Sequence, residues 1–168
     1  NTTETVQTPD QLRTSSSPVY KVEVEQVESL IHQKMNERRV RNGVEPFDTN
    51  KTLDKVAQYK SWDMAQRDYF AHTGPNGTTH MEVREEFQTV CTHTGQNLHY
   101  QEFSSEKTYE YRQSELHDSE EIAFLAVSSL LNSPGHRENA LSPHYDSQGI
   151  GVFVDENGTV FVTQEFCG

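Results

Sequence analysis

Apolar residues recur at helical spacing in the first half of the chain. In residues 22–42 they fall every three or four positions along one side, with charged residues opposite. Gly43 follows this segment and is well suited to end a helix, because glycine adopts the left-handed conformation at low cost. Residues 52–69 repeat the helical pattern, and a shorter helix is predicted over residues 79–89.

The next helical pattern follows a long segment without a clear period. Residues 100–117 carry charged and aromatic side chains at irregular intervals, and we expect them to form an insertion. Asp118 or Ser119 then begins a helix as its N-cap, since either side chain can accept a hydrogen bond from the first backbone amides. Pro134 ends this helix, because proline disfavours helical geometry at the residue before it.

A short polar connector and an alternating pattern complete the chain. The connector SPGHRENAL, residues 133–141, predicts a turn. After it, SQGIGVFVD and TVFVTQEF alternate with a period of two and are joined by ENG, which predicts a C-terminal antiparallel hairpin. GQNLHY, residues 95–100, is a further candidate strand. Together these elements predict an α+β fold with a small, mostly antiparallel sheet covered by helices on both faces, since both strand faces carry apolar residues.

The charge of the chain narrows the classes of partner. Its formal net charge is −12, from 26 acidic and 14 basic residues. Such a chain is repelled by nucleic-acid phosphates and by anionic membrane surfaces, so neither partner is expected. An acidic surface with few lysines also suits high salt, which makes a halophilic source one interpretation and an ordinary acidic protein the other. No apolar run reaches the length of a membrane span.

The composition changes once along the chain. Residues 1–19, NTTETVQTPDQLRTSSSPV, are rich in Thr, Ser, Pro and Gln and contain almost no apolar side chains. They cannot bury enough surface to offset the entropy of ordering, so we predict a flexible linker there. The remaining residues, 20–168, have the length of one domain.

Sequons and cysteines favour an exported protein. Asn-x-Thr sequons are the acceptors of N-glycosylation and indicate a secreted surface, although they also arise readily in Thr-rich sequence. Their asparagines are Asn1, Asn50, Asn76 and Asn157. In an exported chain the two cysteines, Cys91 and Cys167, favour one disulfide, and two buried free thiols are the alternative.

Five stretches of the chain match, in order, the motifs of one protein family. They read NGVEPFDTNKTLDKVAQYKSWDMAQRDYFAH, GPNGTT, GQNL, SLLNSPGHRENAL and GIGVFVDENGTVFVTQEF. On these motifs the chain from Val24 to Phe166 resembles the CAP superfamily, also known as the SCP or CRISP, antigen 5 and PR-1 domain, and most of all its microbial branch. The resemblance implies a three-layer α-β-α sandwich and a secreted or extracellular location, with the N-terminal linker as a tether.

The resemblance also implies a central cleft that contains histidines. His72 matches the histidine that ends the YFxH motif, and His136 is the histidine of the GHR element. Two imidazoles in one cleft can hold a divalent metal such as zinc, which is the cofactor that the resemblance implies. The chain departs from the family pattern twice: Gln96 replaces a glutamate, and Phe161 stands where the animal and plant branch has a histidine.

Other residues of the connector are predicted to be structural. Arg137 has five donors that can join several carbonyls in a turn, and Asn139 can bind backbone groups in the same way. The alternative role for Arg137 is to bind an anionic ligand. Gly135, Gly149 and Gly151 are interpreted as positions where a side chain would clash.

The remaining histidines lie in polar segments of the sequence. We predict that His32, His99 and His117 are solvated. His80 and His144 are also expected to be solvated, and the alternative for both is that they reach the cleft.

Three functions are compatible with the resemblance. The first is a binding module whose cleft, with His72, Gln96, His136 and Arg137, takes a metal ion, a small hydrophobic molecule or a peptide. The second is a structural surface protein that interacts with a protein, lipid or cell-surface partner. The third is a metal-dependent, peptidase-like hydrolase with His72 and His136 as catalytic residues, which the loss of the glutamate at Gln96 disfavours. We expect a monomer and favour the binding module.

Overall fold

The computed structural model describes residues 22–102 and 119–168. The predicted linker, the residue Asp118 and nearly all of the predicted insertion lie outside these ranges, as does His117. The first three residues of that insertion are described, and two of them, Tyr100 and Gln101, belong to a strand.

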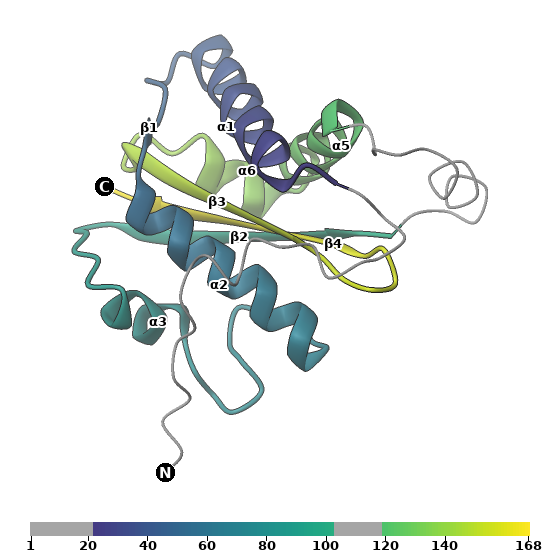
Figure 1. The fold of residues 1–168 in the computed structure, drawn as a ribbon. Helices are drawn as coiled ribbons and strands as arrows, with labels where there is room; N and C mark the ends of the chain where they lie inside the picture. The colour runs from purple at the N-terminus through teal and green to yellow at the C-terminus, as the bar shows by residue number, and fades with distance from the viewer. Residues whose placement is uncertain (1–21, 103–118) are drawn as a thin grey trace.

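The described residues form five helices and four strands (Figure 1). The helices are α1 (Val24–Arg41), α2 (Lys51–Arg67), α3 (His80–Glu86), α5 (Ser119–Asn132) and α6 (Pro134–Ala140). The strands are β1 (Asp48–Thr49), β2 (Thr94–Gln101), β3 (Ser147–Val154) and β4 (Val160–Cys167). The predicted helices and the C-terminal hairpin are therefore confirmed, with small differences at their ends.

The strands form one sheet in the order β1-β3-β4-β2. The pairs β3–β4 and β2–β4 are antiparallel, and the short β1 runs parallel to β3. Helices α1, α5 and α6 lie over one face, and α2 and α3 lie over the other (Figure 1). This is the predicted three-layer arrangement, and β2 forms one edge of the described sheet.

Strand β4 shows why both faces of the sheet need a helical cover. Val160, Val162 and Phe166 belong to the core beneath α1 and α5, and all three are buried. The residues between them point the opposite way: Phe161 packs with Met64 of α2. Because side chains alternate along a strand, a strand with buried residues on both faces must lie between two layers.

Two glycines of β3 allow α2 to lie directly on the sheet. A Cβ on Gly149 would come 2.2 Å from the backbone of Leu53, and one on Gly151 would come 2.2 Å from the backbone of Ala57. The predicted role of both glycines is confirmed. The same prediction is wrong for Gly135, where an added Cβ would meet nothing within 4 Å.

The connector SPGHRENAL folds as a helix rather than as a turn. Ser133 is extended, and Pro134 is the first residue of α6. Proline fits the first position of a helix, because its missing N–H has no partner there. Pro134 therefore ends α5 as predicted and also begins the next helix.

A buried arginine fills the role that was predicted for Arg137. Arg39 of α1 donates to the carbonyls of Glu45, Ala140, Ser142 and Tyr145 at 2.7–3.0 Å. These bonds join α1 to the segment between α6 and β3. The exposed Arg137 instead donates to the Asn42 side chain at 3.2 Å.

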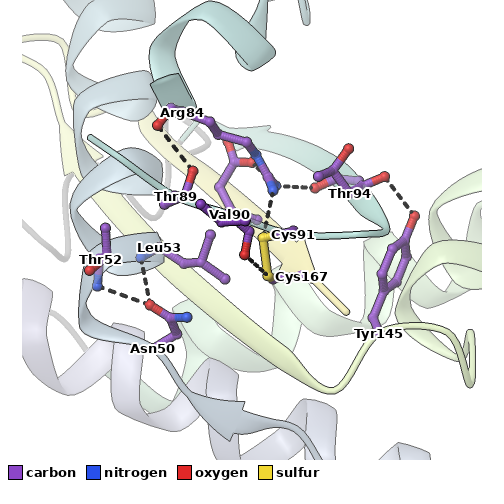
Figure 2. Close-up of a disulfide and its surroundings, with 12 residues drawn as sticks. Asn50, Thr52, Leu53, Arg84, Thr89, Val90, Cys91, Thr94, Tyr145 and Cys167 are labelled. Carbon is purple, nitrogen blue, oxygen red and sulfur yellow. Dashed lines mark hydrogen bonds and ion pairs between the residues drawn. A yellow bond between two sulfur atoms is a disulfide. The ribbon is translucent and has the colours of Figure 1, made fainter. Parts of the chain in front are cut away.

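The predicted disulfide is present and fixes the edge of the sheet. Cys91 and Cys167 are bonded, with 5.4 Å between their Cα atoms and a sequence separation of 76. The bond joins the segment before β2 to the end of β4. Figure 2 shows Arg84 pointing toward this disulfide and toward the start of β2.

The glycosylation candidates differ in their surroundings, and their modification stays a prediction. Asn76 and Asn157 are exposed in turns, whereas Asn1 lies outside the described residues. Asn50 is half-buried and caps α2 by accepting from the amides of Thr52 and Leu53 (Figure 2).

A search of the described helices for membrane spans finds none that combines the required length with enough apolar character.

Candidate functional site

A narrow polar pocket lies between α2, the start of α3 and the sheet. Its free volume is about 10 Å³, which is about the space that one water molecule needs. Its polar lining includes Lys60, Asp63, His72, His80, Gln96 and Glu165. Such a pocket can admit a small polar group but leaves no room for a bulky molecule.

A chain of polar contacts leads from the predicted His72 into the core. The Nδ1 atom of His72 lies 2.8 Å from Oε1 of Gln96. The Gln96 amide nitrogen donates to one oxygen of Glu165, and the Arg84 guanidinium donates to the other at 2.7 Å. With this amide orientation Nδ1 carries the proton, because Oε1 can only accept, and a neutral imidazole then keeps its lone pair on Nε2.

The ion pair between Arg84 and Glu165, at the end of this series of polar contacts, is fully buried. The side chain of Arg84 is 2% exposed and that of Glu165 is 0% exposed. Burial raises the pKa of Glu165, and the Arg84 charge and the Gln96 hydrogen bond act in the opposite direction. Gln96 suits this position because it can donate to the carboxylate and accept from the imidazole at the same time. A glutamate there would place a second acid beside Glu165.

A second polar network holds the backbone of the segment that carries His72. Lys60 donates to the carbonyl of His72 at 3.1 Å and to the Tyr69 hydroxyl at 3.0 Å. Tyr69 donates to Asp63, which also forms two hydrogen bonds with Arg67 at 2.7 and 2.8 Å. Burial lowers the pKa of Lys60 to about 8 and raises that of Tyr69 above its usual value. The network fixes the loop after α2.

His80 lies in this pocket, so its predicted solvation is wrong and the alternative is confirmed. It begins α3, directly after the capping residue Thr79. Its Nδ1 atom is buried and has no hydrogen-bond partner among the residues that the structure describes. Burial and, to a smaller extent, the positive charges of Arg84, His72 and Lys60 together lower the pKa of His80 to about 4.

His136 lies near His72 but on another element, and their joint role as ligands stays a prediction. His136 lies on α6 and is not among the residues that line the pocket. Its carbonyl accepts from Asn97 at 2.9 Å, and burial and the nearby His72 lower its pKa. Asn139 donates to the Asn97 side chain at 3.0 Å, rather than to backbone groups as predicted.

The predicted exposure of two further histidines is wrong. His32 is partly buried and pairs with Gln148 at 2.7 Å, and burial lowers its pKa. His99 is partly buried and pairs with Gln101 at 3.0 Å, and burial lowers its pKa as well. His144 does not line the pocket.

The donor groups in the pocket do not fit a divalent metal. Among residues 22–102 and 119–168, no group of three or more His, Cys, Asp or Glu side chains is arranged to hold one. Both oxygens of Glu165 are engaged, Gln96 is neutral, and Lys60 brings a positive charge. We therefore assign no chemical step to a metal ion, and metal binding by His72 and His136 stays an untested prediction.

Several residues of this site were not identified from the sequence. They are Lys60, Asp63, Tyr69, Arg84 and Glu165. A signal was present in α2, where Lys60, Asp63 and Arg67 are spaced for one face of a helix. The pairing of Arg84 with Glu165 joins residues 81 positions apart and has no local signal.

The fold, the motifs and the polar pocket define a CAP domain. The family model described as "CAP: Cysteine-rich secretory protein family" matches residues 32–166. This match covers most of the chain, and the protein therefore belongs to the cysteine-rich secretory protein family.

A bacterial relative has a similar sequence. The chain is 30% identical, over 133 residues, to the uncharacterized protein YkwD of Bacillus subtilis. The aligned region covers 79% of this chain and 44% of that protein. The chain thus spans less than half of the length of this relative.

Solved structures of bacterial surface and extracellular proteins share the fold. An outer surface protein from Borrelia burgdorferi matches with a TM-score of 0.70 and 18% identity, over 88% of this chain and 96% of that one. An extracellular protein with an SCP domain from Bacillus anthracis matches with a TM-score of 0.66 and 24% identity, over 96% of this chain and 44% of that one.

Proposed function

We propose that this chain is a secreted or cell-surface binding module that takes a small polar group of its ligand into the pocket beside His72. The observation that carries the proposal is the fixed geometry of His72. Its imidazole is held by Gln96 at 2.8 Å, and its carbonyl is held by Lys60 at 3.1 Å. Because one contact holds the imidazole and the other holds the backbone of His72, this residue loses little freedom when a ligand binds.

The same geometry favours binding over hydrolysis. A metal-dependent hydrolase needs a base near the attacking water. Gln96 cannot accept a proton, and Glu165 is already paired with Arg84 and bonded to Gln96. His136, the second catalytic candidate, does not line the pocket.

Two observations support the proposed location: the disulfide, and the similarity of the fold to that of extracellular proteins. A disulfide persists in oxidising compartments, which include the cell exterior. Proteins of the same fold are described as extracellular or outer surface proteins. We propose the same location for this chain.

The proposal can be tested by identifying what the protein retains. The oxidised protein would be incubated with an extract of its producing cells and of their medium, then washed, and bound small molecules would be identified by mass spectrometry. We expect at least one compound to be retained by the wild type and lost in the double variant His72→Ala, Lys60→Met, because that variant removes both polar anchors.

The matched control is His93→Ala, which alters an exposed histidine that does not line the pocket. It should retain the same compound as the wild type. Equal retention by the wild type and the double variant, or no retained compound at all, would contradict the proposed function. Circular dichroism of each variant would establish that it is folded.

A further inference from the structure

We propose that the group bound in this pocket is a carboxylate, held by Lys60 and His80. This inference rests on the proposed function and specifies the class of its ligand. It assigns a ligand-binding role to Lys60 and His80, neither of which was predicted from the resemblance.

The first argument is that two buried nitrogens lack a hydrogen-bond partner. The Nδ1 atom of His80 and the Nε atom of Arg84 have no partner among the residues that the structure describes. They lie four residues apart, on one face of α3, where successive turns bring side chains together. His80 lines the pocket and, with the proton on Nδ1, can donate to a ligand that accepts hydrogen bonds, whereas Arg84 is not among the lining residues.

The second argument is the sign of the local charge. The charged groups that most affect His80 are Arg84, His72 and Lys60, which all carry positive charge when protonated. The negative charges of the two nearby acids are already balanced, because Glu165 is paired with Arg84 and Asp63 is paired with Arg67.

After these two ion pairs are counted, the positive charge of Lys60 is the one left without an acid to balance it. The structure gives acceptors for two of its N–H groups, the Tyr69 hydroxyl and the His72 carbonyl. An ammonium has three, so one N–H is available for a ligand. A pocket with an excess of positive charge favours the binding of an anion.

The third argument is the width of the pocket. The free volume is only about 10 Å³, which is about the room of one water, so a single oxygen of a head group fits but a long apolar chain does not. A carboxylate has two oxygens and can accept from two donors at once. His80 is half-buried and lines the pocket.

A carboxylate can come from a free small acid or from the C-terminus of a peptide. The test is a titration of the ¹⁵N-labelled, disulfide-bonded protein in carboxylate-free buffer, followed by NMR. The probes are acetate, acetyl-Ala-Ala with a free carboxylate, and the same dipeptide as an amide. We expect both acids to shift the Arg84 Nε–H signal with saturation, and the amide to have no effect.

The two acids distinguish the source of the carboxylate. A peptide acid that binds at least tenfold more tightly than acetate indicates a peptide C-terminus, whereas equal binding indicates a free acid. His80→Phe and Lys60→Met should each weaken acid binding at least fivefold, and the control His93→Ala should leave it unchanged. Two variants are used so that a folding defect in one leaves the other informative.

The inference is overturned if neither acid gives a saturable shift, or if the amide shifts the signal as strongly as the acid. Retention of an uncharged compound in the extract experiment, without acid binding, would overturn the carboxylate and leave the proposed function standing. If neither acid binds and no compound is retained from the extract, both the carboxylate and the proposed function are overturned.

Discussion

At the scale of single residues, Gln96 determines which chemistry the pocket supports. It is 5% exposed and joins His72 to the fully buried Glu165. A neutral amide keeps one charge pair, Arg84 with Glu165, in the core. The residue that departs from the family pattern is thus matched to its surroundings in this chain.

Exchanging this amide for an acid gives the first prediction. Gln96→Glu should lower the free energy of unfolding by about 2 kcal/mol at pH 7, because two buried carboxylates would compete for one Arg84. The pKa of the added acid would be raised in the folded state, so the loss should shrink as the pH falls toward 4. Urea unfolding at pH 7 and pH 4.5 measures both effects.

A matched substitution on the surface is the control. Gln66→Glu makes the same chemical change on the exposed side of α2 and should change the stability by less than about 0.5 kcal/mol. A Gln96→Glu variant as stable as the wild type at pH 7 would contradict the described contact with Glu165.

His80 gives a second prediction, on pH dependence. Its pKa is lowered from 6.5 to about 4 in the folded protein, so between these values the unfolded chain binds more protons. Stability should therefore fall as the pH drops from about 6.5 to 4. His80→Gln should reduce this slope in urea midpoints measured across that range, while His93→Gln should preserve it. An unchanged slope in His80→Gln would refute the burial of this imidazole.

At the scale of elements, the contact between α2 and β3 positions the pocket. Helix α2 carries Lys60 and ends just before the loop with His72, and its backbone lies against Gly149 and Gly151. The close approach is possible only because both strand residues lack a side chain. The placement of the site thus depends on two residues that do not take part in it.

The third prediction tests this contact. Gly151→Ala should destabilise the fold by about 3 kcal/mol, because its Cβ would meet the Ala57 backbone at 2.2 Å. Gly135→Ala is the matched control, since its Cβ meets nothing within 4 Å and alanine favours the helix that contains it. Thermal unfolding should show a large fall in the melting temperature for the first variant only.

The elements show what the sequence could and could not predict. Periodicity identifies the helices and the hairpin because their faces are uniformly apolar. It does not identify α6, where Pro134 and Gly135 look like turn residues but fit the first turn of a helix. Nor does it identify the network around Lys60, because polar residues inside a helix are usually interpreted as its exposed side. Burial of these polar residues is a property of the packed layers and is absent from any local pattern.

At the scale of the whole molecule, the disulfide joins segments that are distant along the chain. Cys91 precedes the edge strand β2, and Cys167 ends the central strand β4. The loop that it closes in the unfolded chain contains α5, α6 and β3, together with the segment outside the described residues. A cross-link over such a distance restricts the unfolded state strongly.

The fourth prediction concerns this cross-link. The double variant Cys91→Ser, Cys167→Ser should lose up to about 4 kcal/mol of unfolding free energy relative to the oxidised protein. Guanidinium unfolding measures the loss, and the wild type with added reductant should approach the stability of the variant. Equal stabilities of the oxidised wild type and the variant would show that the bond contributes nothing to the fold.

The order of strands in the sheet has a consequence for how the protein is made. Strand β4 comes last along the chain, yet it lies between β3 and β2 and supplies hydrogen bonds to both. A nascent polypeptide that does not yet include β4 therefore holds two strands with nothing to join them. The sheet can close only after β4 has been synthesised, because both of its antiparallel pairings use this strand.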